Sequence, residues 1–480
     1  MDMDKPHEEC GVFGIYNAAQ CDVVRETFLA LHALQHRGQE SCGIAVSDDG
    51  VFRAHKNQGL VSQVFNQRTL EALGQGMIAI GHVRYSPDDE LERANDQPLV
   101  IRYAKGNLAV AMNGALVNAY EIKNMLQTGG AIFQTNSNAE VVSYVIARER
   151  LNTGSIEDAV QNAMDYLKGA YSMVVMSPHK LIAARDPQGF RPLCMGSLNG
   201  NPVFASESCA IESIGGEFVR DVCPGEVVVC DESGIHSLTG HCGGKSAFCL
   251  FEYIYFARPD SVIGQVSVHF ARRRAGELLA EENPVEADMV CGVPDSGLDA
   301  ALGYAEASGI PYGTALIKNK YIGRTFIQDT QLHREASVRV KLNVLRAAVD
   351  GKRIVLVDDS IVRGTTCRHI VGLLRQAGAK EIHLRVTAPP FRFPCFFGTD
   401  IRSSEDLIAC RLSREAMLSS IGADSVGFLS LQSARRIAGG QTGLCDACFT
   451  GEYPIPVPEK LSTSKYEQKI VQLEVTPRNN

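Results

Sequence analysis

The chain has 480 residues, of which 45% are hydrophobic and 21% are charged, and its formal net charge at pH 7 is −8. This length is enough for two large domains or about three of ordinary size, and the composition is that of a globular protein. No run approaches the roughly 18 consecutive apolar residues of a membrane helix, and the acidic balance provides no basic surface for nucleic acid. We therefore expect neither a membrane nor a nucleic acid as a partner.

The first residues and the cysteines indicate a cellular compartment. Residues 1–9 are polar and acidic, and they have neither the basic region nor the apolar region of a secretory signal. The chain contains 15 cysteines. Without a secretion signal, this number favours a reducing compartment, where thiols bind metals or take part in catalysis. We expect a cytoplasmic protein.

The first half of the chain is rich in short β-forming runs. Helical spacing interrupts them at 22–34 and 139–150. The apolar runs that read as strands are 78–81, 108–111, 171–176, 181–184, 203–206 and 226–229. Many short strands with few helices predict packed antiparallel sheets with helices outside.

Four motifs in this half fit one catalytic pattern. Their sequences are CGVFG, LQHRGQES, GHVRY and NG, and they begin at Cys10, Leu34, Gly81 and Asn113. Together they resemble the glutamine amidotransferases that use an N-terminal nucleophile. The resemblance implies a four-layer αββα domain over residues 10–240, preceded by a propeptide of residues 1–9.

The same resemblance assigns roles to individual residues. Cys10 supplies the thiolate, and its α-amino group becomes the catalytic base once residues 1–9 are removed. The Asn113 amide and the Gly114 backbone N–H form the oxyanion hole, and Arg84 holds the substrate carboxylate by a bidentate pair. Taken alone, Asn113-Gly114 favours a type I′ hairpin turn; the surrounding motifs reverse that preference.

Two positions depart from the pattern of this family. Pro87 stands where the family usually has a threonine that contacts the glutamine α-group, and proline has neither a hydroxyl nor a backbone donor. Asn138 stands where the family has an aspartate that holds the substrate ammonium. Each loss is worth on the order of 1–3 kcal/mol. We expect weakened glutamine binding at Asn138 and Pro87, while use of free ammonia is unaffected.

The second half of the chain has a different pattern. A connection at 240–247 is followed by apolar runs that alternate with helical stretches, and these runs lie at 287–293, 310–317, 354–357 and 382–386. Such alternation predicts a parallel α/β sheet. The expected fold class is therefore α+β in the first domain and α/β in the second, which spans 241–454 and precedes a polar tail, 455–480.

The most informative segment runs from Arg353 to Thr366. An apolar strand ends at Asp358 and Asp359, and a loop rich in Gly and Thr follows before the next helix. This loop can present N–H and hydroxyl donors to a phosphate, and the two carboxylates suit ribose hydroxyls and a hard cation. The segment resembles the phosphoribosyl-pyrophosphate (PRPP) motif of type I phosphoribosyltransferases. By that resemblance, the substrate contacts are Ser360, Arg363, Gly364, Thr365 and Thr366.

Two further segments complete the expected PRPP site. The tetrapeptide from Pro294 resembles the pyrophosphate loop of these enzymes, although in isolation it would be only a turn. Its Asp295 and Gly297 would bind substrate, and its Ser296 would join Asp358 and Asp359 at Mg²⁺. A basic stretch resembles the lid over PRPP, although such a stretch is more often a solvated loop; its substrate contacts would be Lys318, Arg324 and Lys341.

A cysteine pair lies near the end of the chain. Cys445 and Cys448 form a C-x-x-C, which alone fits zinc and redox sites as well. The surrounding residues resemble an iron–sulfur branch, in which Cys249 and Cys395 are the other ligands of a [4Fe–4S] cluster. Zinc is the alternative. Because the ligands come from distant parts of the chain, a structural role is favoured over electron transfer.

The two halves together, from about Cys10 to Pro454, resemble the amidophosphoribosyltransferase family. The resemblance implies that glutamine and PRPP are converted to phosphoribosylamine, in a homo-oligomer inhibited by purine nucleotides. One alternative is an ammonia-dependent enzyme that aminates PRPP and binds glutamine only weakly. Another is a non-catalytic PRPP or nucleotide sensor, against which the intact Cys10, Ser296, Asp358 and Asp359 count.

Overall fold

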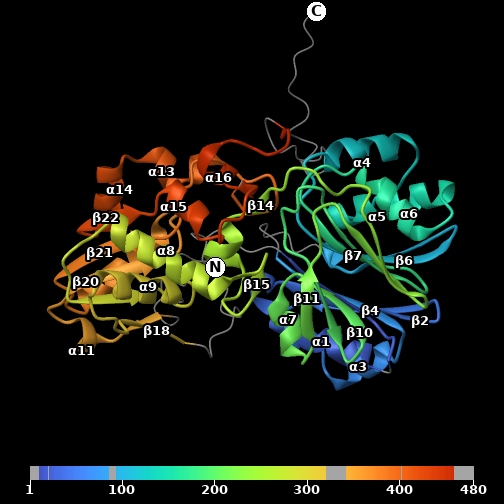
Figure 1. Cartoon of the computed structure of the whole chain (residues 1–480), viewed down its shortest axis with the longest axis horizontal. Helices are drawn as coiled ribbons and strands as arrows, with labels where there is room; N and C mark the ends of the chain where they lie inside the picture. Colours follow the sequence, from blue (N-terminus) through green and yellow to red (C-terminus); the bar gives the residue numbers. More distant parts are fainter. Residues whose placement is uncertain (1–9, 20, 86–92, 320–341, 402, 459–480) are drawn as a thin grey trace, which may run out of the picture.

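The computed structural model describes residues 10–19, 21–85, 93–319, 342–401 and 403–458 (Figure 1). Two antiparallel sheets dominate the first half. The seven-stranded sheet has the order β11 (Glu217–Asp221), β9 (Cys194–Leu198), β10 (Asn201–Ala205), β1 (Gly11–Tyr16), β4 (Ile78–Arg84), β2 (Ser41–Asp48) and β3 (Val51–Gln58). The six-stranded sheet has the order β13 (Gly234–Leu238), β12 (Val227–Asp231), β8 (Leu181–Arg185), β7 (Ser172–Met176), β6 (Gly106–Asn113) and β5 (Leu99–Tyr103).

The two sheets pack face to face, with helices on their outer faces. Val12 of β1 and Ile80 of β4 meet Ala109 of β6 and Val174 of β7 in the buried layer between the sheets. Helices α1 (Val23–Ala33) and α7 (Ser208–Ser213) cover the seven-stranded sheet, and α5 (Asn138–Asn152) and α6 (Ile156–Met164) cover the other. Figure 1 shows these four layers. The predicted αββα arrangement is confirmed.

The two helices expected in this half form within a few residues of their predicted limits. The Asp22 side chain accepts a hydrogen bond from the Arg25 N–H at 3.1 Å and caps α1. Ser137 caps α5 in the same way through the Ala139 N–H. The prediction missed several shorter helices, whose few turns give a weak periodic signal: α3 (Gln67–Leu73), α4 (Ala119–Thr128), α6 and α7.

The second half contains the expected parallel sheet. Its strands follow the order β17 (Met289–Gly292), β20 (Arg353–Asp358), β21 (Glu381–Val386) and β22 (Ser425–Phe428), all parallel. Helices α8 (Val268–Glu282) and α9 (Leu298–Ser308) cover one face, and α12 (Thr365–Gln376) and α14 (Arg414–Ile421) cover the other. Because both faces are covered, β17 and β20 are nearly continuous apolar runs. Strand β21 is also buried, but it includes His383 and Arg385.

The run 310–317 was expected to be a strand, and this was wrong. Only β18 (Leu316–Lys318) forms, and it pairs with β19 (Leu342–Val344) outside the main sheet. Upstream, Tyr312 makes a single bridge with Val290 of β17. Pro311 has no N–H to donate to a ladder, so the segment adds one bridge to the sheet edge and no strand.

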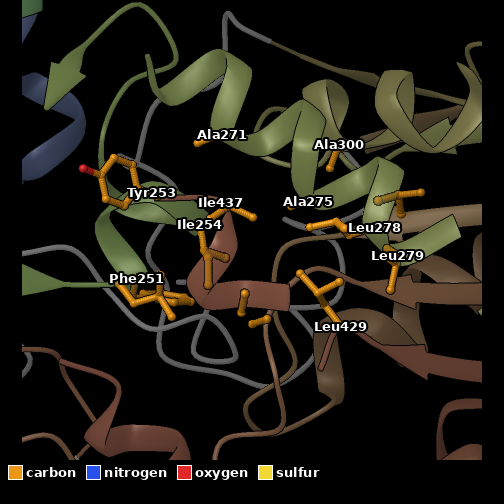
Figure 2. Close-up of a cluster of buried hydrophobic side chains, with 14 of the residues drawn as sticks. Phe251, Tyr253, Ile254, Ala271, Ala275, Leu278, Leu279, Ala300, Leu429 and Ile437 are labelled. Atoms are coloured by element: carbon orange, nitrogen blue, oxygen red, sulfur yellow. The ribbon is translucent and has the colours of Figure 1, made fainter. Parts of the chain in front are cut away.

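An aromatic segment in the middle of the chain packs into the hydrophobic core of the second half. The π-helical turn η3 (Glu252–Phe256) packs with Phe251 against α8. Figure 2 shows Phe251, Tyr253 and Ile254 around the same buried cluster as Ala275 and Leu278 of α8. Just before it, β14 (Phe248–Cys249) pairs in parallel with β23 (Leu444–Cys445), where the chain returns from its far end.

The remaining elements are short. They are η1 (Gln35–Arg37), α2 (Val61–Val64), η2 (Arg93–Asn95), β15 (Val262–Ile263), β16 (Val266–Ser267), α11 (Arg346–Val349), η5 (Ser404–Asp406), α13 (Ile408–Arg411), α15 (Leu431–Arg436) and α16 (Ala447–Thr450). Within the part of the chain that the structure describes, no helix combines the length and apolarity needed to cross a membrane.

Candidate active sites

Cys10 lies where the central strand of the seven-stranded sheet begins. It directly precedes β1, whose Gly11 is opposite Val83 of β4, so Cys10 comes beside the end of β4 that carries Arg84. The half-buried thiol lies 4.0 Å from the Tyr85 carbonyl oxygen. The Arg37 Nε donates to the carbonyl oxygen of Cys10 at 3.4 Å. The predicted nucleophile therefore lies at one end of the sheet sandwich.

Asn113 comes to this same end from the other sheet. His82 of β4 donates from Nε2 to the Met112 carbonyl oxygen of β6 at 3.1 Å, which ties the two sheets together next to Arg84 and Asn113. Burial lowers the pKa of His82 to about 3, so this ring is neutral at physiological pH. Cys10, Arg84 and Asn113 are thus brought to one end of the sandwich by three different strands.

The Asn113 amide is buried and has unused hydrogen-bonding capacity. Its side chain is fully buried, and among the described residues neither its nitrogen nor its oxygen finds a partner. An unpartnered buried polar group costs about 1–3 kcal/mol, and a substrate oxyanion would relieve that cost. Gly114 has φ of +124°, and a Cβ there would come 2.3 Å from the Ala170 carbonyl oxygen, so only glycine fits.

The hairpin interpretation of Asn113-Gly114 is wrong. Strand β6 ends at Asn113, and its neighbours in the sheet are β5 and β7. The chain continues from Gly114 into α4, and β7 follows only after α5 and α6. The dipeptide therefore does not join two adjacent strands.

Arg84 is held from one side by a buried carboxylate. Its Nη1 lies 3.5 Å from Oδ1 of Asp96, whose side chain is 2% exposed. This single long contact involves one guanidinium nitrogen, and a guanidinium has five donors in all. Lys56 Nζ donates to the Asp96 carbonyl oxygen at 2.6 Å and fixes that segment.

Asn138 is the first residue of α5 and is half-buried. The segment before it is fixed because the Glu140 carboxylate accepts from the N–H and the hydroxyl of Thr135 at 2.7 and 2.8 Å. The Asn136 N–H donates to Asn95 Oδ1 at 3.0 Å. Asn138 is therefore brought toward the segment whose Asp96 contacts Arg84. Pro87 lies outside the described residues.

The paired carboxylates lie where β20 ends, as predicted. Asp358 and Asp359 are both buried. Asp359 accepts hydrogen bonds from the hydroxyl of Ser296, in the loop after β17, and from the hydroxyl of Ser360 at 2.5 Å. Asp358 Oδ1 accepts from the Asp359 N–H at 2.9 Å. Ser296 and the two aspartates thus lie together at the carboxyl edge of the sheet, although they come from separate strand-to-helix loops.

The loop after these aspartates leads into a helix N-terminus. Gly364 has φ of +86° and precedes α12, which begins at Thr365. A Cβ on Gly364 would come 2.5 Å from Cδ1 of Ile408, so glycine is required. Thr365 and Thr366 lie in the first turn of α12, and the N-terminus of a helix favours an anion through its N–H groups and its dipole. Arg363 Nη2 lies 3.5 Å from Asp406 in a partly exposed pair.

The tetrapeptide 294–297 forms the turn between β17 and α9. Gly297 N–H donates to the Val293 carbonyl oxygen at 2.9 Å, and a Cβ on Gly297 would lie 2.5 Å from the Val357 carbonyl oxygen. Glycine therefore allows this loop to approach β20. Lys318 Nζ contacts Asp295 Oδ2 at 2.6 Å, which joins two of the predicted contacts in a solvent-exposed pair. Arg324 and Lys341 lie outside the described residues.

Four cysteines share one cavity. Cys249, Cys395, Cys445 and Cys448 line it together with aromatic side chains that include Phe391 and Phe397. Cys249 and Cys445 are opposite one another in the β14–β23 pair. Burial raises the pKa of Cys249 to about 12. As arranged among the described residues, no group of three His, Cys, Asp or Glu side chains could hold a metal ion.

A buried charge cluster between the two halves has no recognisable pattern in the sequence. Arg37, Glu207, Arg191 and Glu252 have at most 1% of their surface exposed and contact one another in a chain of ion pairs. Arg37 stood in a recognised motif but received no role. The partners are 61 to 215 positions apart in sequence, and no local pattern links them.

Fold and sites define a class of protein: a glutamine amidotransferase joined to a phosphoribosyltransferase. Models of known families agree, because residues 82–213 match a glutamine amidotransferase domain and residues 269–390 match a phosphoribosyl transferase domain. The curated relatives extend this similarity over nearly the whole chain. The amidophosphoribosyltransferase of Archaeoglobus fulgidus is 47% identical, with 94% of this chain and 98% of the relative covered. That of Bacillus subtilis is 46% identical, with 94% and 95% covered.

Solved structures give the same result. One described as the allosteric regulatory enzyme of purine biosynthesis is 45% identical, with a TM-score of 0.89 over 94% of this chain and 97% of that chain. Another, glutamine PRPP amidotransferase from B. subtilis complexed with ADP and GMP, is 46% identical with a TM-score of 0.87 over 94% and 98%. The chain belongs to the amidophosphoribosyltransferase family. It is a pentosyltransferase of purine biosynthesis.

Proposed function

We propose that this chain makes 5-phosphoribosylamine from glutamine and PRPP, the first committed step of purine synthesis. The observation that supports glutamine use is the buried amide of Asn113, which has no partner among the described residues and lies at the end of the sandwich where Cys10 lies. A buried amide without a partner is costly, and an oxyanion formed at Cys10 gives it one. The Asp358–Asp359 pair before α12 supports PRPP as the second substrate.

In the glutaminase half, Cys10 is the nucleophile and its freed α-amino group is the base. The thiol attacks the amide carbon, the base delivers the proton to the departing ammonia, and water then hydrolyses the thioester. Asn113 and the Gly114 N–H stabilise the oxyanion, and Arg84 and Asn138 hold the α-carboxylate and α-amino group. Removal of residues 1–9 is part of this proposal, because an upstream peptide bond would abolish the base.

In the transferase half, ammonia attacks C1 of the ribose and pyrophosphate leaves. Asp358 and Asp359 accept from the ribose hydroxyls, and the loop Ser360–Thr366 holds the 5-phosphate at the start of α12. Asp295 and Gly297 contact the pyrophosphate, with Lys318, Arg324 and Lys341 as its cations. Two carboxylates and the Ser296 hydroxyl are the hard oxygen donors that Mg²⁺ prefers, so the residues fit this ion, which when bound neutralises the leaving pyrophosphate.

An assay of the purified protein with two nitrogen donors tests this function. Pyrophosphate release from PRPP should occur with glutamine and with ammonium, and glutamate should form only with glutamine. A protein that releases pyrophosphate with ammonium alone would instead be the ammonia-dependent alternative. A protein that binds PRPP but releases no pyrophosphate with either donor would be the sensor.

Asn138, which stands where the family has an aspartate, favours weakened glutamine binding, as in the ammonia-dependent alternative. Changing Asn138 to Asp restores a charge facing the substrate ammonium, and we expect glutamine KM to fall roughly tenfold, which corresponds to about 1.4 kcal/mol. The kcat with glutamine and the ammonia-dependent rate should stay unchanged, because a contact that is equally strong in the ground state and the transition state changes KM but not kcat. A glutamine titration at saturating PRPP measures this. Tight binding by the parent with no gain in the variant would show that the pocket compensates elsewhere.

We further propose that Cys249, Cys395, Cys445 and Cys448 hold a [4Fe–4S] cluster. The observation that supports this proposal is that four thiols from distant chain segments line one cavity together with aromatic side chains. Anaerobically purified protein should be brown and contain about four iron per chain. Cys445→Ser should lose the iron and unfold more readily, because metal binding supplies folding energy. Cys410→Ser, at an exposed cysteine outside the cavity, should keep it. Stoichiometric zinc without iron would instead support the zinc alternative.

The remaining parts of the proposal concern organisation. The glutaminase domain spans 10–240, the transferase domain spans 241–454, and 455–480 is a tail; β13 ends at Leu238 and β14 begins at Phe248, which supports the boundary. Purine nucleotides are proposed as inhibitors, as one solved relative was complexed with ADP and GMP. A homo-oligomer in the cytoplasm, with neither nucleic acid nor membrane as a partner, completes the proposal.

A further inference from the structure

A buried cluster of four charges joins the two halves of the chain. Arg37 belongs to η1 and Glu207 precedes α7, both in the first half, and Arg191 follows β8. Glu252 belongs to η3, which packs against α8. Arg37 donates to Glu207 at 2.5 Å and to both carboxylate oxygens of Glu252 at 3.1 and 2.8 Å, and Arg191 donates to Glu252 at 3.3 Å. Two cations and two anions are therefore buried together.

Stability alone does not account for such a cluster. Removing four charges from water carries a large desolvation cost, and well-packed apolar residues of similar volume are often at least as stable. The Glu252 and Glu207 charges outweigh the burial of Arg37 and raise the pKa of its guanidinium well above the ordinary value. Arg37 is therefore held as a charged, hydrogen-bonded guanidinium. A fixed guanidinium can position a neighbouring group.

The neighbouring group at one end is the proposed nucleophile. Arg37 Nε donates to the carbonyl oxygen of Cys10. Once residues 1–9 are removed, only the carbonyl group of Cys10 is part of a peptide bond. The backbone then holds this residue from its C-terminal side alone. The thiol and the α-amino group share a Cα with that carbonyl. Restraining the carbonyl therefore restrains the directions in which the nucleophile and its base point.

At the other end the cluster reaches the transferase half. Arg191 donates through Nε and Nη2 to the Phe397 carbonyl oxygen at 3.2 and 2.9 Å. Arg272 of α8 donates to the carbonyl oxygens of Tyr253 and Ala257 at 3.0 and 2.7 Å and so fixes η3. Figure 2 shows Phe251 and Tyr253, which flank Glu252 in the sequence, in the same buried cluster as residues of α8. Glu252 is thus presented to Arg37 by the second half of the chain.

We propose that Arg37 is a positioning residue for Cys10 and that Glu252, which the transferase half supplies, holds Arg37 in place. The glutaminase is therefore competent only when the two halves are docked. This inference rests on the proposed role of Cys10 as the glutamine nucleophile. It predicts that the chemistry at Cys10 depends on Glu252, although Glu252 belongs to neither proposed substrate site.

The test replaces Glu252 by Gln, which keeps the volume and removes the charge. We expect glutamine-dependent kcat to fall about tenfold or more while glutamine KM and the ammonia-dependent rate change by less than about twofold. Iodoacetamide should alkylate Cys10 at least about fivefold more slowly, read by mass spectrometry of the N-terminal peptide. Glu252→Asp, which restores the charge, should recover part of both losses.

A matched control is the Arg220–Glu226 pair. It is also bidentate, at 2.8 and 2.7 Å, with a buried carboxylate, but it does not join the two halves. Glu226→Gln should leave glutamine kcat and Cys10 alkylation unchanged. If Glu252→Gln does not fold, Arg37→Lys provides the second variant, because it keeps the charge but loses the bidentate pair, and the same selective loss is expected.

The outcomes separate this inference from the proposed function. Equal losses of the glutamine and ammonia reactions in Glu252→Gln, or unchanged kcat and alkylation, would overturn the positioning role. A parent protein that does not hydrolyse glutamine, or a Cys10→Ala variant that still does, would overturn the proposed function itself.

Discussion

Replacing Cys10 by alanine should lower glutamine-dependent synthesis by roughly 10³-fold or more, because the variant has no nucleophile for the amide carbon. Ammonia-dependent synthesis should stay within about twofold of the parent, because free ammonia bypasses this step. Pyrophosphate release measured with each nitrogen donor at saturating PRPP gives both rates. The split between donors is the informative result, since a misfolded variant would lose both.

Cys21 provides the control for this substitution. It lies in the same half of the chain and is also half-buried, and burial raises its pKa to about 11, so it remains a thiol at physiological pH. Cys21→Ala should keep both activities. N-terminal sequencing of the active parent should begin at Cys10. An active protein that retains Met1, or a Cys10→Ala variant that still uses glutamine, would contradict the assignment of Cys10.

The parts of the fold that could be predicted are those with a strong local pattern. The run that became β20 is apolar along its whole length and ends in two aspartates, so both the strand and the site at its end could be inferred. The run 310–317 looked similarly apolar, but Pro311 and the glycines beside it limited it to one bridge. The β-propensity of this run predicted the wrong structure because pairing in a sheet also requires backbone N–H donors.

The site residues divide in the same way. Two strand-end motifs predicted that Asp358, Asp359 and Ser296 act together. The structure places the Ser296 hydroxyl against Asp359, and their joint role stays a prediction. Glu252 was beyond sequence reasoning, because its partner Arg37 is 215 positions away and a lone glutamate in an aromatic segment carries no signal. Only the packing of the two halves brings that pair together.

Asp359→Asn is the second substitution expected to have a large effect. The buried carboxylate accepts hydrogen bonds from Ser296 and Ser360, and the proposed site needs its charge for both the ribose hydroxyls and Mg²⁺. Loss of one buried charged partner typically costs about 3–5 kcal/mol, so kcat/KM for PRPP should fall by roughly 10²–10³-fold. Ammonia should be the nitrogen donor in this assay, so that the glutaminase half does not contribute.

The other end of the same sheet supplies the control for Asp359→Asn. Asp288 precedes β17 and pairs with Arg353 at 2.9 Å at the exposed amino edge, where the Arg353 hydrogen bonds hold the pKa of Asp288 down to about 2. Exposed pairs of this kind contribute little to stability, so Asp288→Asn should keep its PRPP kinetics. Because both substitutions remove one carboxylate charge from the same sheet, a general effect of charge would lower both activities. Equal PRPP kinetics in the two variants would place the PRPP site somewhere other than the carboxyl edge of β20.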